Sequence, residues 1–104
     1  MYRGTTPTYI FTLPESVDMT QATDVYVTFA KTDTTIIFTK TGDDLEVTEH
    51  TVSVYLTQEE TLSFPNAKVA VQLNWLFPNG RRACSNILYI TARQNLINEV
   101  IEGD

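Results

Sequence analysis

The amino-acid sequence predicts an all-β fold. Apolar and polar residues alternate with a period of two, as in strands with one buried face, most clearly over residues 51–56 and 67–76. Turn residues separate several such short runs, and no segment shows a long helical period or a strand–helix–strand alternation. These features are typical of an antiparallel sandwich with an immunoglobulin-like arrangement of about seven strands, one short helical turn and a short C-terminal tail.

The chain length of 104 residues suits one domain whose core needs no disulfide or metal. We expect the sandwich over residues 1–94 and a tail over residues 95–104 that forms a short helix or a docking segment. The single cysteine excludes an intramolecular disulfide and favours a reducing compartment. No run reaches the ~18 apolar residues of a membrane span, and the start lacks a signal peptide's apolar region, so a soluble protein is expected.

Four strands are predicted in the first half of the chain. Pro14 ends the first, because proline has no N–H to give to a ladder. Residues 32–34 are expected to turn the second strand into the third, and Gly42 marks the next break, since glycine accepts a positive φ. The predicted strands are residues 8–13, 24–31, 35–40 and 45–47.

The second half is predicted to hold three strands and one helical turn. Thr57 and Glu60 have the spacing of a capping box, which predicts a single turn of helix crossing between the sheets. Trp75, the only tryptophan, lies on the apolar face of the longest strand, and we expect it inside. The predicted strands are residues 51–56, 67–76 and 83–92.

The register of the final hairpin has two solutions. Pro78 lacks the N–H that a two-residue turn would use, which favours a three-residue loop with a bulge at Gly80 and places Trp75 beside Ala83. An even-numbered loop instead puts Cys84, Leu88 and Ile90 on the face of Val69, Val71 and Leu73. The second solution buries more apolar surface, so we favour it.

The tail has a helical pattern. Apolar residues at positions 96, 97, 100 and 101 follow Asn95, a residue suited to a helix cap. A helix this short is not stable alone in water, where about 12 residues are needed, so it must pack on something. Its own domain and a neighbouring subunit are both open as that partner.

The charge balance argues against nucleic acid as a partner. Thirteen acidic and seven basic residues give a net charge of −6, which repels a phosphate backbone. The basic residues are scattered along the chain, with Arg81 and Arg82 as the one adjacent pair. We therefore expect neither nucleic acid nor a membrane as a partner.

Cys84 and His50 are the first residues to consider for chemistry. Cys84 lies on the apolar face in the favoured register, whereas a reactive thiolate needs a polar and cationic setting, so we predict a packing role. His50 is the only histidine and has no Cys or His cluster around it, which predicts a solvated loop residue and no zinc site.

The acidic residues also favour structural roles. Asp43, Asp44 and Glu46 lack the spacing of a calcium loop and are expected to form a charged turn. Glu59 and Glu60 point apart on a helical turn, and Glu60 is assigned to the cap. The sequence contains no phosphate loop, nucleophile elbow or paired-cysteine motif, so we predict no enzyme, no catalytic residue, no cofactor and no metal.

Candidate contact residues for a protein partner are aromatic, cationic or apolar. Each tyrosine could equally be a half-buried strand residue, and the arginine pair could simply be solvated. Tyrosines on strand faces turned away from the core can anchor an interface, and a pair of arginines at a hairpin tip can grip a carboxylate or phosphate. The candidates are Tyr26, Tyr55, Arg81, Arg82, Tyr89, Leu96, Ile97, Val100 and Ile101.

Four segments in order carry a family resemblance: VDMTQATDVYVTFAK, GDDLEV after a hairpin, VSVYLTQEETLSF, and KVAVQLNWLFPNGRRACSNI. Together they resemble small β-sandwich proteins of tailed phages and prophages of Gram-positive bacteria, similar to the N-terminal domain of baseplate upper proteins. The resemblance spans residues 8–92, and none of its matching positions is catalytic. These positions are Asp18, Met19, Thr20, Leu56, Thr57, Thr61, Gly80 and Ser85.

The resemblance implies a structural or accessory protein of a phage or prophage. Such a protein would bind other virion proteins and itself, as a homo-oligomer, and would be found in the virion after assembly in the bacterial cytoplasm. Two alternatives stay open: a small phage-encoded regulator that binds a host protein, and a carbohydrate-binding sandwich on the phage surface.

Overall fold

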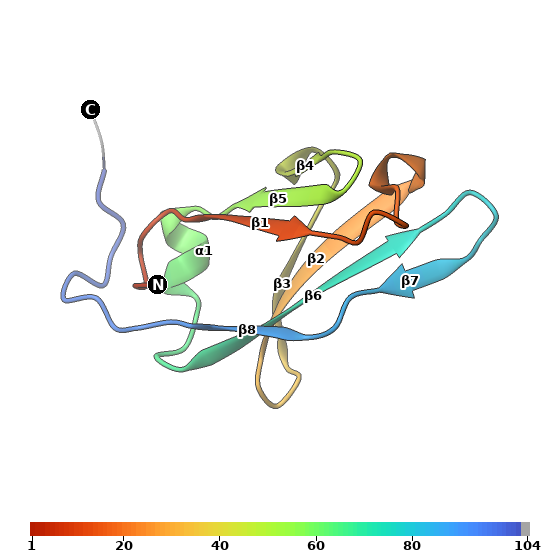
Figure 1. Cartoon of the computed structure of the whole chain (residues 1–104). Helices are drawn as coiled ribbons and strands as arrows, with labels where there is room; N and C mark the ends of the chain where they lie inside the picture. Colours follow the sequence, from red (N-terminus) through yellow and green to blue (C-terminus); the bar gives the residue numbers. More distant parts are fainter. Residues whose placement is uncertain (103–104) are drawn as a thin grey trace.

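The computed structural model describes residues 1–102 and is a sandwich of two antiparallel sheets (Figure 1). The smaller sheet has the order β1-β5-β4, and the larger has the order β3-β2-β6-β7 with β8 also paired to β6. This confirms the predicted all-β sandwich. The strands are β1 (Thr8–Thr12), β2 (Asp24–Lys31), β3 (Ile36–Thr41), β4 (Leu45–Val47), β5 (Thr51–Tyr55), β6 (Lys68–Leu76), β7 (Arg82–Cys84) and β8 (Leu88–Thr91).

One α-helical turn, α1 (Gln58–Leu62), carries the chain from β5 to β6. Its capping box is present as predicted: the Glu60 N–H donates to Thr57, and the Glu60 carboxylate accepts from the Thr57 N–H. Two 3-10 turns not predicted from the sequence, η1 (Met19–Gln21) and η2 (Gly42–Asp44), precede β2 and β4. No helix in residues 1–102 is long and apolar enough to cross a membrane.

The core lies between the two sheets and contains the apolar faces that the alternation predicted. Phe29 and Phe38 of the larger sheet pack against each other and against Phe64, which follows α1, with ring centroids 5.0 to 5.7 Å apart. Trp75 is 5% exposed, so its predicted place inside is confirmed. The other fully buried side chains include Met19, Val27, Val52, Val54, Leu56, Val69, Val71 and Leu73.

The final hairpin uses both of the registers considered, one in each half. Near the turn, Trp75 pairs with Ala83, the Phe77 N–H donates to the Arg81 carbonyl over 2.9 Å, and Gly80 has a φ of 83°. The favoured even-numbered loop is therefore wrong there, because Pro78 and Gly80 form the bulged three-residue loop.

Further along the hairpin the register shifts by one residue. In β8, Ile90 pairs with Val69 and Leu88 with Val71, as the even register required. Ser85 lies at the shift: its N–H donates to the Leu73 carbonyl and its Oγ accepts from the Leu73 N–H. The single predicted strand over residues 83–92 is thus divided into β7 and β8.

The tail forms no helix over residues 95–102, and positions 103–104 lie outside the described residues. The helical prediction for this segment is wrong. Asn95 makes the side-chain contact expected of a helix cap, since its Oδ1 accepts from the Ile97 N–H, but no helix follows in residues 96–102. The chain continues in an irregular path past α1 (Figure 1). Just before the tail, Arg93 forms a parallel bridge with Tyr2, which joins the two ends of the domain.

Candidate interaction surfaces

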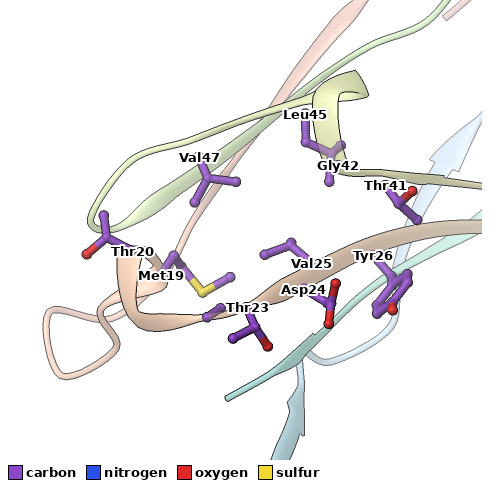
Figure 2. A pocket seen from close by; sticks show the side chains of 11 residues that line it. Met19, Thr20, Thr23, Asp24, Val25, Tyr26, Thr41, Gly42, Leu45 and Val47 are labelled. Atoms are coloured by element: carbon purple, nitrogen blue, oxygen red, sulfur yellow. The ribbon is translucent and has the colours of Figure 1, made fainter. Parts of the chain in front are cut away.

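A hollow of about 480 Å³ lies between η1, the start of β2 and the short strand β4 (Figure 2). Its apolar lining comes from Met19, Val25, Leu45 and Val47, whose side chains face one another across the opening. Asp24 is the one carboxylate among the lining residues. The lining therefore offers apolar contact and lacks the paired groups that proton transfer or metal binding would use.

Cys84 does not lie where the sequence placed it, and His50 lies in a loop as predicted but is more buried than expected. Cys84 is exposed, because the bulged turn pairs it with Asn74 and turns it to the outer face of the larger sheet. The predicted packing role of Cys84 is therefore wrong. His50 is half-buried rather than fully solvated, and its Nδ1 lies 2.8 Å from the Val17 carbonyl oxygen. Within residues 1–102, no group of three His, Cys, Asp or Glu residues could hold a metal ion.

The Glu60 carboxylate is part of a structural network. Its Oε1 accepts from the Thr57 N–H and from Lys40 Nζ, each over 2.8 Å. Burial opposes ionisation of Glu60, but the hydrogen bond and charge of Lys40 and the bond from Thr57 outweigh it and hold the Glu60 pKa below its ordinary value. Asp43 and Asp44 lie exposed in η2 and Glu46 is exposed in β4, as expected for a charged turn.

The outer surface of the larger sheet, which we call the sheet face, has a hollow of about 330 Å³ in its middle. The cross-strand pairs Ala30–Ala70 and Thr28–Gln72 lie on its floor, and Asn74 lies at one end. The facing alanines explain the hollow, because two small side chains lie directly opposite each other on neighbouring strands and leave the space above them unfilled. The floor is uncharged.

Larger side chains form the rim of this hollow. Ile36 from β3, Ile87 and Tyr89 are 64%, 47% and 59% exposed. Arg82 and Lys31 are the charged residues of the lining, and no carboxylate is among them. The Arg82 guanidinium donates to the Asn74 side chain over 3.0 and 3.2 Å, which fixes its position at the rim. The hollow therefore combines apolar side chains, uncharged polar groups on its floor and a cationic edge.

The structure brings three of the predicted contact residues to this sheet face. Tyr26 and Arg82 line a second depression next to the hollow, and Tyr89 stands at the hollow's rim. Arg81 is exposed in the turn before β7. Tyr55 belongs to the smaller sheet, so it is not part of this surface.

The tail holds the remaining predicted residues and is bound to its own domain through polar groups. Arg3 donates to the side chains of Gln94 and Asn98 and to the Leu62 carbonyl. The Gln58 amide both accepts from the Ile101 N–H over 2.8 Å and donates to the Ile101 carbonyl over 3.0 Å.

The apolar side chains of the tail stay largely exposed. Leu96, Ile97, Val100 and Ile101 are 102%, 51%, 39% and 60% exposed. Val100 lines a shallow depression together with Tyr55, so these two predicted contact residues lie close together. The tail therefore presents an apolar surface beside α1.

Arg3, Gln58 and Lys40 were not singled out from the sequence. Their partners are distant in the chain, for example 91 residues for Arg3 and Gln94 and 43 residues for Gln58 and Ile101. No local pattern signals such contacts. The alanines under the hollow were also missed, since a small residue on a strand face carries no sequence signal of its own.

No family model, curated protein or solved structure matches this chain. The functional proposal therefore rests on the surfaces described above and on the resemblance seen in the sequence.

Proposed function

We propose that this chain is a non-enzymatic structural or accessory protein of a phage or prophage that acts through protein–protein contacts in tail or baseplate assembly. The sequence resemblance supplies the phage context. The virion is then the place of action, and other virion proteins together with further copies of the chain are the partners.

The observation that supports contact with proteins is the composition of the sheet face. Its centre is an uncharged hollow, with exposed isoleucine and tyrosine side chains around it and an ordered arginine at the edge. Protein interfaces are enriched in aromatic residues and arginine and depleted of charge at their centre. Tyr26 and Tyr89 supply the aromatic anchors.

A role in carbohydrate binding is less well supported. Sugar-binding surfaces commonly offer an exposed aromatic platform; Trp75 is buried in the core, which leaves exposed tyrosines such as Tyr89 to supply one. The regulatory alternative, in which the chain binds a host protein, predicts that the protein is absent from finished particles.

The proposal is tested by following incorporation into particles. Ala70→Glu would fill the hollow with a charged side chain, and Ile10→Glu, at a position 65% exposed on the smaller sheet, is the matched control. We expect mass spectrometry of purified particles to detect the wild type and the control but not Ala70→Glu. Absence of the wild-type chain from particles would contradict the proposal and favour the regulatory alternative.

A further inference from the structure

The tail is an apolar segment whose backbone is held in place by its own domain. Gln58 satisfies both backbone groups of Ile101, and Arg3 binds the side chain of Asn98. These bonds leave Leu96 and Ile97, which are 102% and 51% exposed, directed away from the domain core. Exposed aliphatic groups on an ordered segment cost little further ordering entropy when they bind.

The sheet face offers a matching cavity on another part of the molecule. Its hollow of about 330 Å³ has an uncharged floor with alanines from β2 and β6, and Ile36, Ile87 and Tyr89 at the rim. The tail runs beside α1 (Figure 1). The hollow lies on the outer face of the larger sheet. One chain therefore presents the tail and the hollow on different parts of its surface, where each could contact a different copy.

The charges around the hollow and along the tail are opposite in sign, which favours the tail of another copy as the segment that fills the hollow. The ionised residues around the hollow are Lys31 and Arg82, with no carboxylate among the lining residues. The tail carries Glu99 and Glu102, both exposed, among its aliphatic residues. An acidic segment with exposed aliphatic side chains thus meets an uncharged hollow with a cationic edge, which is the charge complementarity that orients two partners and excludes wrong ones.

We infer that the C-terminal tail of one copy docks in the sheet-face hollow of a second copy, so that the protein assembles head to tail. This inference rests on the proposed function and names another copy of this chain as a partner of the sheet face. Because the two contacting surfaces differ, the assembly closes into a ring or grows as a filament.

The test compares the sedimentation of the full chain with that of two kinds of variant. Leu96→Asp with Ile97→Asp disables the tail at exposed positions, while Ala70→Glu or, separately, Tyr89→Asp disables the hollow. Each variant is expected to weaken self-association at least about tenfold, as loss of an interface anchor does. Ile10→Asp on the smaller sheet should assemble as the wild type does. Circular dichroism confirms that each variant is folded.

A mixture of the two kinds of variant gives the sharper result. The tail variant keeps a working hollow, and the hollow variant keeps a working tail, so together they should form a one-to-one dimer and nothing larger. A mixture that stays monomeric overturns the inference, as does a wild-type chain that is monomeric at all concentrations. Loss of Ala70→Glu from particles despite a monomeric wild type would retain the proposed function with a different partner.

Charge reversal supplies a second measurement. Lys31→Glu with Arg82→Glu should weaken assembly, and mixing that variant with Glu99→Lys plus Glu102→Lys should restore it across the reversed contact. Failure of this rescue, with both variants folded, overturns the assignment of the tail as the occupant.

Discussion

Lys40 connects the two sheets at the scale of a single residue. It lies in β3 of the larger sheet, is 8% exposed, and its Nζ donates to the Tyr55 carbonyl over 2.6 Å and to Glu60 over 2.8 Å. Tyr55 ends β5 of the smaller sheet, and Glu60 lies in α1. A lysine at this place in a strand would be expected in solvent from the sequence alone.

We expect Lys40→Met to destabilise the protein by about 2 kcal/mol. The substitution leaves the Glu60 carboxylate, whose side chain is 25% exposed, without its cationic partner. Urea unfolding measures this effect. Lys68→Met, at an exposed position on β6, is the control and should stay within about 0.5 kcal/mol of the wild type. Equal losses in both variants would contradict a structural role for the ion pair.

The Glu60 pKa makes the stability depend on acid pH. Because the folded state lowers this pKa from its ordinary value of 4.5, the contribution is fully present above pH 4.5 and is lost as the pH falls through the folded pKa. Glu60→Gln should therefore lose less stability than the wild type between neutral pH and pH values below 4.5. Urea midpoints at both ends of this range measure the difference, and identical pH dependence would contradict it.

Within residues 1–102, Thr34 is the one non-glycine residue with a positive φ, at 73°, and it lies in the turn between β2 and β3. A β-branched residue is strained in this region, whereas glycine is not. We expect Thr34→Gly to raise the free energy of unfolding by about 0.5 to 1 kcal/mol. Thr32→Gly, without a positive φ to relieve, should lower it. Thermal unfolding of the two variants distinguishes them, and a loss of stability in Thr34→Gly would contradict the strain.

At the scale of the elements, the sequence predicted the strands well but not the register of the final hairpin, in which β6 pairs with β7 and β8. Alternation identified β2 and β6 with their buried faces, since one buried face leaves a period of two in the residues themselves. The capping box identified α1 in the same local way. The register shift at Ser85 depends on hydrogen bonds between Ser85 and Leu73, twelve residues apart in the chain, and no local pattern predicts such a contact.

Ser85→Ala tests what holds the shifted register. The Ser85 Oγ accepts from the Leu73 N–H over 3.0 Å, so the alanine removes the partner of a backbone donor in the longest strand. We expect a loss of about 1 to 2 kcal/mol and faster hydrogen exchange at the Leu73 amide. Ser16→Ala, at an exposed loop position, should show neither effect. Unchanged exchange at Leu73 would contradict this account of the register.

Over residues 95–102 the tail does not form the predicted helix, for a related reason. Its apolar spacing indicates a helix, yet the segment is fixed by polar bonds from Gln58 and Arg3, which belong to distant parts of the chain. The two Gln58 bonds satisfy the backbone N–H and C=O of Ile101, so these groups have partners without a helix.

Gln58→Ala should release the tail without unfolding the domain. Both backbone groups of Ile101 lose their partner, while alanine suits the first turn of α1. We expect faster hydrogen exchange at the Ile101 amide and a change in global stability within about 1 kcal/mol. Glu59→Ala, an exposed neighbour in the same helix, should leave exchange at Ile101 unchanged. Equal exchange in both variants would contradict the role of Gln58.

At the scale of the whole molecule, the net charge is −6, but the residues that line the hollow of the sheet face carry no negative charge. Its lining carries Lys31 and Arg82, while acidic residues gather in η2 and at the start of α1. Because of this division, the sheet face of one copy does not repel the acidic surfaces of another copy.

The candidate surfaces were partly visible in the sequence. Tyr26, Arg82 and Tyr89 could be named from alternation and composition, and the sandwich brings them to one sheet face. The hollow between them could not, because it depends on Ala30 and Ala70 meeting across neighbouring strands. Sheet order is set by tertiary packing rather than by local pattern.

The single cysteine gives a direct test of the central claim, that the sheet face is the surface by which this protein docks in an assembly. Cys84 is exposed on that face and pairs with Asn74 at the end of the hollow. The measurement is the rate of Cys84 alkylation in the isolated monomer and in assembled phage particles, read by mass spectrometry. We expect rapid alkylation in the monomer and strong protection in the particles. Equal rates in the two states would contradict the claim.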